Sequence, residues 1–180
     1  MIFDEDDIIF KCQKGDAIAF TDLVGEYQGS VYNLAMKMLN DVGDAEDMVQ
    51  EVFLKVWNSI KFYSAQKSKF SAWLYTLTSR SCLDQLRKRK RIVKVSDEEL
   101  TKLCDIEQPE ITMDDRDAAE LIRGLSDSLT PTQKIVFVLR DIEGYDVSEV
   151  VTVSGLTEKQ IKDNLYLARK SIKEKMRKLV

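Results

Sequence analysis

Three helix-start signals of one kind, closely spaced in the last third of the chain, constrain the fold more than any other feature of the sequence. Each is a capping box, in which a side-chain oxygen accepts a hydrogen bond from the third amide of a helix while an acid or amide side chain reaches back. The pairs are Thr130 with Gln133, Asp146 with Glu149, and Thr157 with Gln160. They predict helices that begin near residues 131, 147 and 158.

The residues between these signals predict a helix-turn-helix. Pro131 stands at the first helical position, where its missing N–H costs nothing, and Gly144 and Gly155 supply turns. The middle helix has room for about two turns before Gly155, and a long basic helix follows. A short helix, a glycine turn and a long basic helix form the pattern of helix-turn-helix DNA-binding proteins.

The first half of the chain also has a helical period. Apolar residues at positions 48, 49, 52, 53, 56 and 57 form a wide stripe on one face of a helix that starts near Asp44. Apolar residues from Ala19 to Leu39 predict one or two helices that end near Asn40, which gives a three- or four-helix N-terminal bundle. The sequence contains no sustained alternation of apolar and polar residues of the kind found in strands, and no internal repeat. We therefore expect an all-α fold of two small helical domains.

Charged residues are segregated along the sequence, and this pattern places the domain boundary. Acids outnumber bases by 12 to 3 in residues 1–51 and by 10 to 2 in residues 97–120, whereas bases outnumber acids by 7 to 1 in residues 80–94 and by 8 to 3 in residues 157–180. Low hydrophobicity and Pro109 are typical of a linker in the second acidic stretch. The predicted boundaries are residues 1–94 for the first domain, 95–113 for the acidic linker and 114–180 for the second domain.

Missing residue types exclude several classes of chemistry. The chain has no histidine, which excludes a Ser-His-Asp or Cys-His nucleophile, an imidazole base and a histidine-ligated metal. Cys12, Cys82 and Cys104 lie far apart without a CxxC motif, as expected for reduced thiols. No apolar run approaches the roughly 20 residues that span a bilayer, and the N-terminus is acidic where a signal peptide is basic. We expect a cytoplasmic protein with no catalytic residues, cofactor, metal, small-molecule substrate or membrane insertion.

Two basic helices are candidates for DNA binding. The last predicted helix carries polar residues in its first turns, which can contact base edges, and bases along its tail, which suit phosphates. The helix that begins near Phe70 ends in five consecutive cations, Arg87 to Arg91, a footprint for a phosphate backbone. In both cases the alternative is a solvated basic face. Trp73 can stack on a base, but its spacing with Phe70 and Leu77 favours a core position.

The helix of residues 44–57 has an acidic face that is a candidate for protein binding. Asp47, Gln50, Glu51 and Leu54 lie together on this face by the three- and four-residue spacing of a helix. A leucine exposed among acids suggests a protein contact, although single exposed apolar residues are common. A magnesium site on Asp44, Glu46, Asp47 and Glu51 is the alternative for the acids of this helix. No phosphate loop, HExxH or EF-hand spacing accompanies them, and the helix dipole favours acids near a helix start.

Three segments together resemble the extracytoplasmic function (ECF) sigma factors of bacterial RNA polymerase, a subfamily of the sigma-70 family. They are DAEDMVQEVFLKVW (Asp44–Trp57), FSAWLYTLTSRSCLDQLRKRKR (Phe70–Arg91) and LTPTQKIVFVLRDIEGYDVSEVVTVSGLTEKQIKDNLYLARKSIKEKM (Leu129–Met176). Their order and spacing are more specific than any single motif, and they cover both predicted domains. The resemblance implies a sigma-2 domain followed by a sigma-4 domain, which bind core RNA polymerase and direct promoter-specific transcription initiation.

The resemblance also implies roles for individual residues. Core-polymerase binding is implied for Asp44, Asp47, Gln50, Glu51 and Leu54. Minus 10 recognition and melting is implied for the loop of residues 61–69 and the helix after it, at Phe62, Lys67, Lys69, Trp73, Arg80, Arg87, Lys88, Arg89 and Arg91. Minus 35 readout in the major groove is implied for Thr157, Lys159, Gln160, Asp163, Asn164, Arg169, Lys170 and Lys173. The implied partners are core RNA polymerase, through its beta-prime clamp helices and beta flap, promoter DNA and an anti-sigma factor.

The chain departs from the family pattern at two places that read DNA. Family members usually have Arg-Asn where this chain has Ser79-Arg80, and Ser-Arg where it has Asp163-Asn164. The promoter sequence therefore cannot be copied from relatives. Asp163 can accept a hydrogen bond from cytosine N4, and Asn164 can pair with adenine through two bonds.

Two other functions compete with the sigma-factor interpretation. A stand-alone helix-turn-helix regulator with an N-terminal sensing domain would bind promoter DNA tightly without core polymerase. The acidic residues 1–51 favour the sigma factor, because their negative charge would repel free DNA. A metal-dependent nuclease that uses the acidic cluster is the other alternative, and sustained DNA cleavage with magnesium would reveal it.

Overall fold

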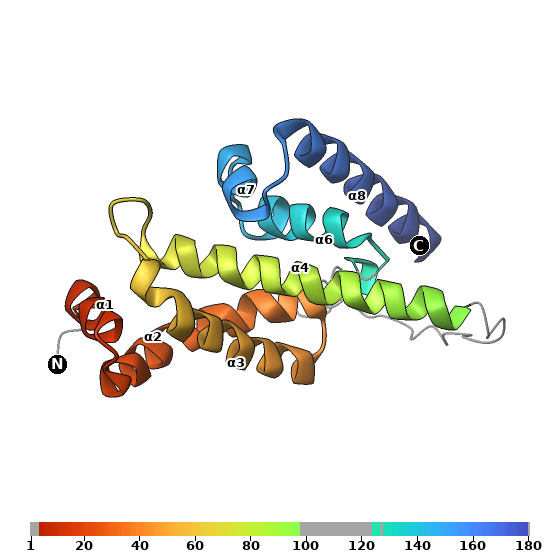
Figure 1. The fold of residues 1–180 in the computed structure, drawn as a ribbon. Coiled ribbons are helices and arrows are strands. Elements are labelled where there is room, and N and C mark those ends of the chain that lie inside the picture. Colours follow the sequence, from red (N-terminus) through yellow and green to blue (C-terminus); the bar gives the residue numbers. More distant parts are fainter. Residues whose placement is uncertain (1–3, 98–123, 127, 180) are drawn as a thin grey trace. The chain divides into compact units, whose positions relative to one another are not determined.

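The computed structural model describes residues 4–97, 124–126 and 128–179, and all regular structure in these ranges is helical. The chain divides into two compact units (Figure 1). The first comprises Met1–Cys82 with Thr152–Gly155, and the second Leu83–Val151 with Leu156–Val180. The prediction of an all-α chain with two helical domains is confirmed.

Four helices and a short turn make up the first half of the chain. They are α1 (Glu5–Gln13), α2 (Ala17–Leu39), α3 (Val42–Ser59), the 3-10 turn η1 (Ile60–Phe62) and α4 (Phe70–Asp97). Asp4, Asp16 and Asp41 begin the first three helices, since each side chain accepts hydrogen bonds from amides of the first turn. Asn40 ends α2 as predicted, in the left-handed region with a φ of 54°.

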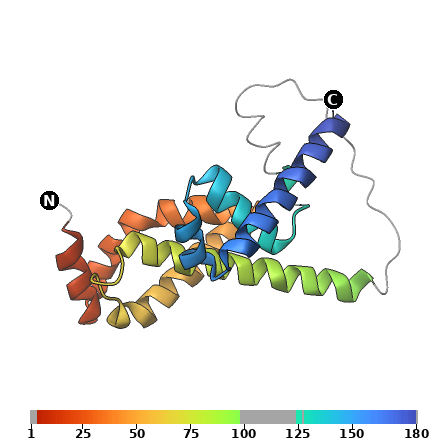
Figure 2. The ribbon, with the colours of Figure 1, turned by 90° about the horizontal axis from the view of Figure 1, so that it is seen from above.

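α2, α3 and the first half of α4 lie side by side in both views of the ribbon (Figures 1 and 2). Their buried side chains form one core, which includes Leu23, Leu34 and Met38 of α2, Met48, Val52, Phe53 and Val56 of α3, and Phe70 and Leu74 of α4. The predicted stripe on α3 is thus buried along most of its length. Val49 is half-buried, and Trp57 is 37% exposed, with its ring packed against that of Phe20 at a centroid distance of 4.8 Å.

All three predicted capping boxes form in the second half of the chain. The helices that they begin are α6 (Pro131–Phe137), α7 (Val147–Ser154) and α8 (Glu158–Leu179). At α7 the Glu149 amide donates to Asp146 Oδ1 at 2.8 Å, and the Asp146 amide donates to Glu149 Oε2 at 2.7 Å. Gly144 and Gly155 have φ values of 73° and 71°, which suit glycine and end the preceding helical segments. The helix-turn-helix prediction therefore agrees with the local structure.

α6 continues into a wider helical turn that no sequence signal predicted. This π-helical turn, η2, spans Val138–Ile142. The Glu143 amide donates to the carbonyl of Val138 at 2.9 Å, five residues back rather than the four of an α-helix. The wider turn precedes Gly144 and places the side chain of Asp141 opposite α8, where it forms an ion pair described below.

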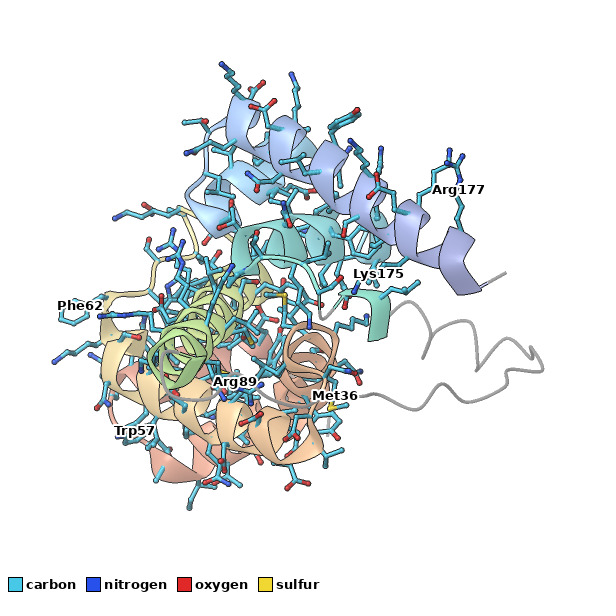
Figure 3. All side chains as sticks on the ribbon, turned by 90° about the vertical axis from the view of Figure 1, so that its right-hand side faces the viewer. Met36, Trp57, Phe62, Arg89, Lys175 and Arg177 are labelled. Carbon is cyan, nitrogen blue, oxygen red and sulfur yellow. The ribbon has the colours of Figure 1, made fainter. Side chains whose placement is uncertain are left out.

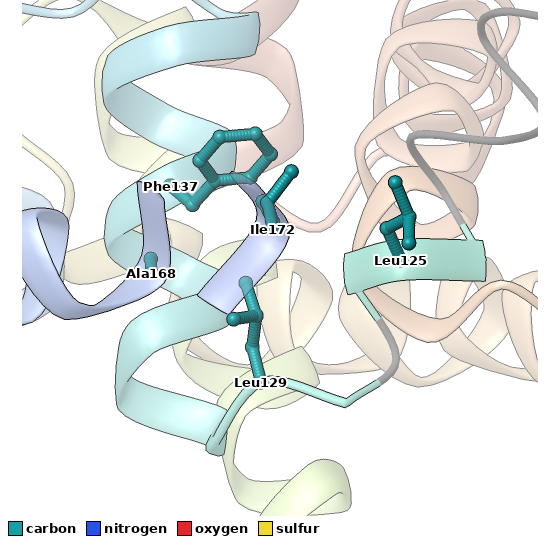
Figure 4. Close-up of a cluster of buried hydrophobic side chains, with 5 residues drawn as sticks. All are labelled: Leu125, Leu129, Phe137, Ala168 and Ile172. Carbon is teal, nitrogen blue, oxygen red and sulfur yellow. The ribbon is translucent and has the colours of Figure 1, made fainter. Parts of the chain in front are cut away.

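A cluster of apolar side chains forms part of the core of the second unit (Figure 4). Leu125, Leu129, Phe137, Ala168 and Ile172 are all buried. Phe137 comes from α6, and Ala168 and Ile172 lie one turn apart on α8, so the cluster joins these two helices. Packing of apolar side chains between α6 and α8 therefore fixes which face of α8 is turned to solvent.

Most of the predicted linker lies outside the described residues. α4 continues to Asp97, so helix extends into the first positions of the range 95–113. The rest of that range and Cys104 lie outside the described residues. Among the helices that the structure describes, none is long and apolar enough to cross a membrane.

Candidate functional site

α3 turns an acidic face with one leucine toward solvent. Asp47, Gln50 and Glu51 are exposed, and Leu54 is 64% exposed although it is apolar. The buried stripe occupies the other side of the helix. The structure therefore brings four of the five predicted core-binding residues onto one exposed face, while Asp44 is half-buried in the first turn of α3.

A polar network fixes this acidic face relative to α4. Lys55 Nζ lies 2.6 Å from Glu51 Oε1 and donates to Ser81 Oγ at 2.8 Å. The next residue in the chain, Cys82, is fully buried, and burial raises the pKa of its thiol to about 12. The thiol is therefore protonated and unreactive at neutral pH, and its role is packing.

Residues 61–69, which comprise the end of η1 and the loop that leads into α4, contain the predicted minus 10 residues Phe62, Lys67 and Lys69, and all three are exposed. Phe62 is 75% exposed, and Figure 3 shows its ring pointing away from the helices. Lys61 Nζ lies 5.0 Å from the centroid of this ring, within the range of a cation–π contact. An exposed aromatic ring beside cations is suited to stack on an unpaired base.

Aromatic rings close the base of this loop. Trp73, predicted both as a DNA contact and as a core residue, is half-buried. Its ring centroid lies 5.3 Å from that of Tyr63 and 5.7 Å from that of Phe70, distances typical of packed aromatic pairs. Tyr63 donates from its hydroxyl to the carbonyl of Ser68 at 2.9 Å, which ties the two ends of the loop together. Trp73 is thus part of the support of the loop, and part of its surface stays exposed.

α4 carries predicted basic residues, with Arg80 in its first half and the others in its second half. Arg80, Arg87, Lys88 and Arg91 are exposed, whereas Arg89, labelled in Figure 3, is half-buried. Arg87 Nη1 lies 3.9 Å from Asp84 Oδ1, and both side chains are more than half exposed, so this ion pair is weak. The exposed cations form a basic surface, and a contact between this surface and a phosphate backbone stays a prediction.

The first turns of α8 carry the predicted minus 35 residues. Thr157, Lys159, Gln160 and Asp163 are exposed, with Thr157 and Gln160 bonded to each other in the capping box. Asn164 is half-buried, and its Nδ2 donates to the Gln160 carbonyl at 2.7 Å. That bond uses one amide hydrogen and leaves the other hydrogen and Oδ1, the donor and acceptor that adenine requires.

Arg169, predicted to bind DNA, is paired within its own unit. Its Nε and Nη2 donate to the two carboxylate oxygens of Asp141 at 2.8 and 2.6 Å, and these bonds raise the pKa of the guanidinium further. The two-pronged pair joins α8 to η2 and restrains both. Lys170 and Lys173, the other predicted cations of this helix, are exposed. Lys175 and Arg177 extend the basic surface toward the end of α8 (Figure 3).

The structure adds two exposed side chains to the minus 35 candidates. Tyr166 is 67% exposed and Leu167 is 47% exposed. With Asp163 and Lys170 they have the spacing of a single helix face, a pattern visible in the sequence but not assigned a role there. Apolar side chains on a DNA-reading face can contact thymine methyl groups.

These residues lie on three exposed surfaces. Among the described residues, no group of three or more acids and cysteines is placed to hold a metal ion. The exposed surfaces consist of an acidic face on α3, an aromatic and basic loop with the cations of α4, and the basic helix α8.

Models of two protein families match the chain. Sigma-70 region 2 matches residues 23–92, which contain α3, the loop and most of α4. Sigma-70 region 4 matches residues 119–172, which contain the helix-turn-helix. The acidic face of α3, the loop and the cations of α4 therefore lie within the first matched region, and α8 lies within the second as far as Ile172.

Curated relatives agree with the family models over most of the chain. The chain is 31% identical to the ECF RNA polymerase sigma factor SigE of Mycolicibacterium smegmatis over 89% of its own length and 62% of that protein. It is 27% identical to the ECF RNA polymerase sigma factor SigW of Bacillus subtilis over 95% of its length and 96% of that protein. A solved structure of the sigma factor RpoE of Bartonella quintana in complex with the anti-sigma factor NepR has a similar fold, with a TM-score of 0.64, 22% identity and coverage of 88% and 96% of the two chains.

Proposed function

Because the chain belongs to the ECF sigma factors of the sigma-70 family, we propose that it binds core RNA polymerase and directs initiation at promoters defined by a minus 10 and a minus 35 element. The observation that carries this proposal is the presence on one chain of an acidic face with an exposed leucine and of two separate basic surfaces. Leu54 is exposed among acids on α3, Phe62 is exposed among lysines in the loop, and α8 carries a basic outer face.

We assign core binding to the acidic face of α3. Asp47, Gln50, Glu51 and Leu54 would contact the clamp helices of the beta-prime subunit, with Asp44 at the edge of the contact. An exposed leucine surrounded by polar side chains has the composition of an interface anchor, whose burial on binding provides the affinity. The acids around it favour a basic partner surface and fix the orientation of the complex.

Minus 10 melting is assigned to the loop of residues 61–69 and to α4. Phe62 and the exposed part of Trp73 would stack on unpaired bases, and the exposed cations would hold the phosphates of the same strand. These cations are Lys67, Lys69, Arg80, Arg87, Lys88 and Arg91, with the half-buried Arg89 beside them. Unpairing a base costs a few kcal/mol, which contacts to the displaced base offset.

Minus 35 readout is assigned to the first turns of α8. Lys159, Gln160, Asp163 and Asn164 lie where base edges are read, Thr157 begins the helix, and Lys170 and Lys173 would bind phosphates. Arg169 contributes by holding α8 against Asp141. The beta flap of the polymerase is the proposed protein contact of this unit. An anti-sigma factor, of the kind bound to the solved relative, is the proposed regulator.

This function requires no bond chemistry from the chain, and we propose that it is not an enzyme. The chain would bind the polymerase and position it at the promoter. A sigma factor differs from a stand-alone helix-turn-helix regulator in one measurable respect, which is whether tight and specific DNA binding requires core polymerase.

Selection from a library of random duplex DNA tests the proposal. We expect the chain mixed with core RNA polymerase to enrich a two-part motif with a constant spacing, and the chain alone to enrich nothing at the same salt concentration. Enrichment of the same motif by the chain alone would instead support the stand-alone regulator. Sustained cleavage of the library in magnesium would support a nuclease.

A further inference from the structure

The loop that is proposed to capture the minus 10 strand is held in place by a side chain from α1, which lies 47 positions or more before it in the sequence. Gln13, the last residue of α1, donates from Nε2 to the carbonyl of Ile60 at 3.1 Å and to the carbonyl of Tyr63 at 3.0 Å. The amide of Gln13 thus bonds to the first residue of η1 and to Tyr63, the residue that follows η1. Gln13 is half-buried, and Ile60 and Tyr63 are buried, so water competes weakly for these bonds.

The two carbonyls belong to the end of a helix, where carbonyl groups lack partners within the helix itself. α3 passes into η1, and the Tyr63 amide also donates to the Ile60 carbonyl at 3.0 Å to close the 3-10 turn. Gln13 supplies the remaining bonds from another element. Without them the Tyr63 carbonyl would need a different partner, and the turn would no longer be fastened to α1 by these bonds.

Phe62 lies between the two bonded carbonyls, and its ring is the most exposed aromatic ring of the described residues. A phenylalanine on a free loop would reduce its exposed apolar surface by folding back on the protein. Here the backbone on both sides of Phe62 is fixed, by Gln13 at Ile60 and Tyr63 and by the bond from Tyr63 to Ser68 at 2.9 Å. The ring is therefore held outward with Lys61 beside it.

We propose that Gln13 is a positioning residue for promoter opening, and that α1 acts through it to hold Phe62 where an unpaired minus 10 base can stack. The inference rests on the proposed function. α1 precedes the residues matched by either family model. Through Gln13 it would contribute to DNA opening without contacting DNA. Holding the ring before DNA arrives avoids the entropy cost of ordering the loop during capture.

The test compares Gln13→Met and Gln13→Glu, which keep the length of the side chain but donate no hydrogen bond, with Gln28→Met and Gln28→Glu as controls. Gln28 is exposed on α2, and its variants change polarity and charge by the same amounts. Each is assembled with core polymerase on the motif enriched in the library selection, and open complex is measured by fluorescence of 2-aminopurine in the minus 10 non-template strand. Affinity for core is measured in parallel.

We expect both Gln13 variants to lower the equilibrium constant for opening about fivefold or more, as removal of two half-buried hydrogen bonds implies, with unchanged affinity for core. The Gln28 variants should match the wild type. In a Phe62→Ala background, Gln13→Met should change opening less than about twofold, because the ring that Gln13 positions is absent.

An equal loss of opening from Gln13→Met in the wild-type and Phe62→Ala backgrounds would overturn the inference, since Gln13 would then only fasten α1 to the bundle. Wild-type opening by Phe62→Ala would overturn it as well. The comparison with the Phe62→Ala background holds even if the Gln13 variants are less stable, because it measures coupling between the two residues. Failure of the wild-type chain to open any promoter with core polymerase would instead contradict the proposed function.

Discussion

Leu54 is 64% exposed although it is apolar and lies on a helix whose other side is buried in the core of the first unit. We predict that Leu54→Arg abolishes binding to core polymerase and leaves the fold intact. A charge at the centre of the contact would be buried without a counterion, which costs several kcal/mol. Affinity for fluorescently labelled core polymerase and helicity by circular dichroism test the two parts of this prediction.

Val42→Arg is the matched control for this substitution. Val42 is 56% exposed on the same helix but lies three turns earlier and on a different side. It should retain the affinity of the wild type. Normal core binding by Leu54→Arg would remove the acidic face from the proposed interface, and loss of helicity would mean that the leucine supports the fold.

Asn164 is the residue at which a single side chain is expected to determine one base of the promoter. Its amide is oriented by the bond to the Gln160 carbonyl, and the remaining donor and acceptor match adenine. We predict that Asn164→Ala costs about 1–3 kcal/mol on the preferred promoter and relaxes one position of the minus 35 element. Selection from a randomised minus 35 library by holoenzyme measures both effects.

Lys173→Ala is the control, because removing a cation that binds phosphate should weaken every promoter alike. Identical base preferences for the wild type and Asn164→Ala would place α8 in another register, with the exposed Tyr166 and Leu167 as the next candidates.

At the level of elements, the turn between α7 and α8 depends on a glycine in the left-handed region. Gly155 has a φ of 71°, a conformation that costs an L-residue about 1–2 kcal/mol. Gly25 lies inside α2 with open space around the position of a Cβ, so alanine there should stabilise by about 0.5–1 kcal/mol. We predict that Gly155→Ala and Gly25→Ala shift the free energy of unfolding in opposite directions. Urea unfolding of the full chain measures both, and destabilisation by both would contradict the argument from backbone conformation.

We expect the cations in the second half of α4 to contact promoter DNA only through its phosphates. We predict that changing Arg87, Lys88 and Arg89 to Gln weakens promoter complexes nearly uniformly across sequences and lowers the salt slope by about one unit for each phosphate that is no longer neutralised. Arg87 and Lys88 are exposed, whereas Arg89 is half-buried and should contribute least. Binding titrations of holoenzyme at several salt concentrations measure the slope. A changed base preference at constant slope would show that these residues read bases.

The elements that local signals define were predictable from the sequence. The capping boxes at Thr130, Asp146 and Thr157 placed three helix starts correctly, because each signal involves residues only three positions apart. The helix end at Asn40 was predicted for the same reason, and α3 begins at Val42, two residues before the expected Asp44. Periodicity also separated the buried stripe of α3 from its acidic face.

Features that depend on distant contacts were not predictable from local patterns. The amide of Gln13 bonds to residues 47 and 50 positions away, and nothing near Gln13 in the sequence signals this. The exposure of Trp57 depends on how far α3 extends past Phe20 of α2, which periodicity does not determine. The π-helical turn at η2 and the pair of Asp141 with Arg169 likewise require knowledge of how α6 and α8 pack.

At the scale of the whole molecule, the distribution of charge explains why DNA binding should require a partner. Residues 1–51 contain 12 acids and 3 bases, a net charge of −9, whereas residues 157–180 contain 8 bases and 3 acids, a net charge of +5. The acidic part would repel DNA from the free chain. Binding of the acidic face of α3 to a basic surface of the polymerase would neutralise part of this charge and leave the basic surfaces to contact the promoter.

Transcription from a reconstituted system tests the central claim most directly. Core RNA polymerase, nucleotides and a library of genomic fragments are incubated with and without the chain, and the 5′ ends of the transcripts are sequenced. We predict that the chain produces start sites downstream of a shared two-part motif, that core alone does not use these sites, and that Leu54→Arg abolishes them. Start sites that are the same with the chain, without it and with Leu54→Arg would contradict the assignment of this protein as a promoter-specificity factor.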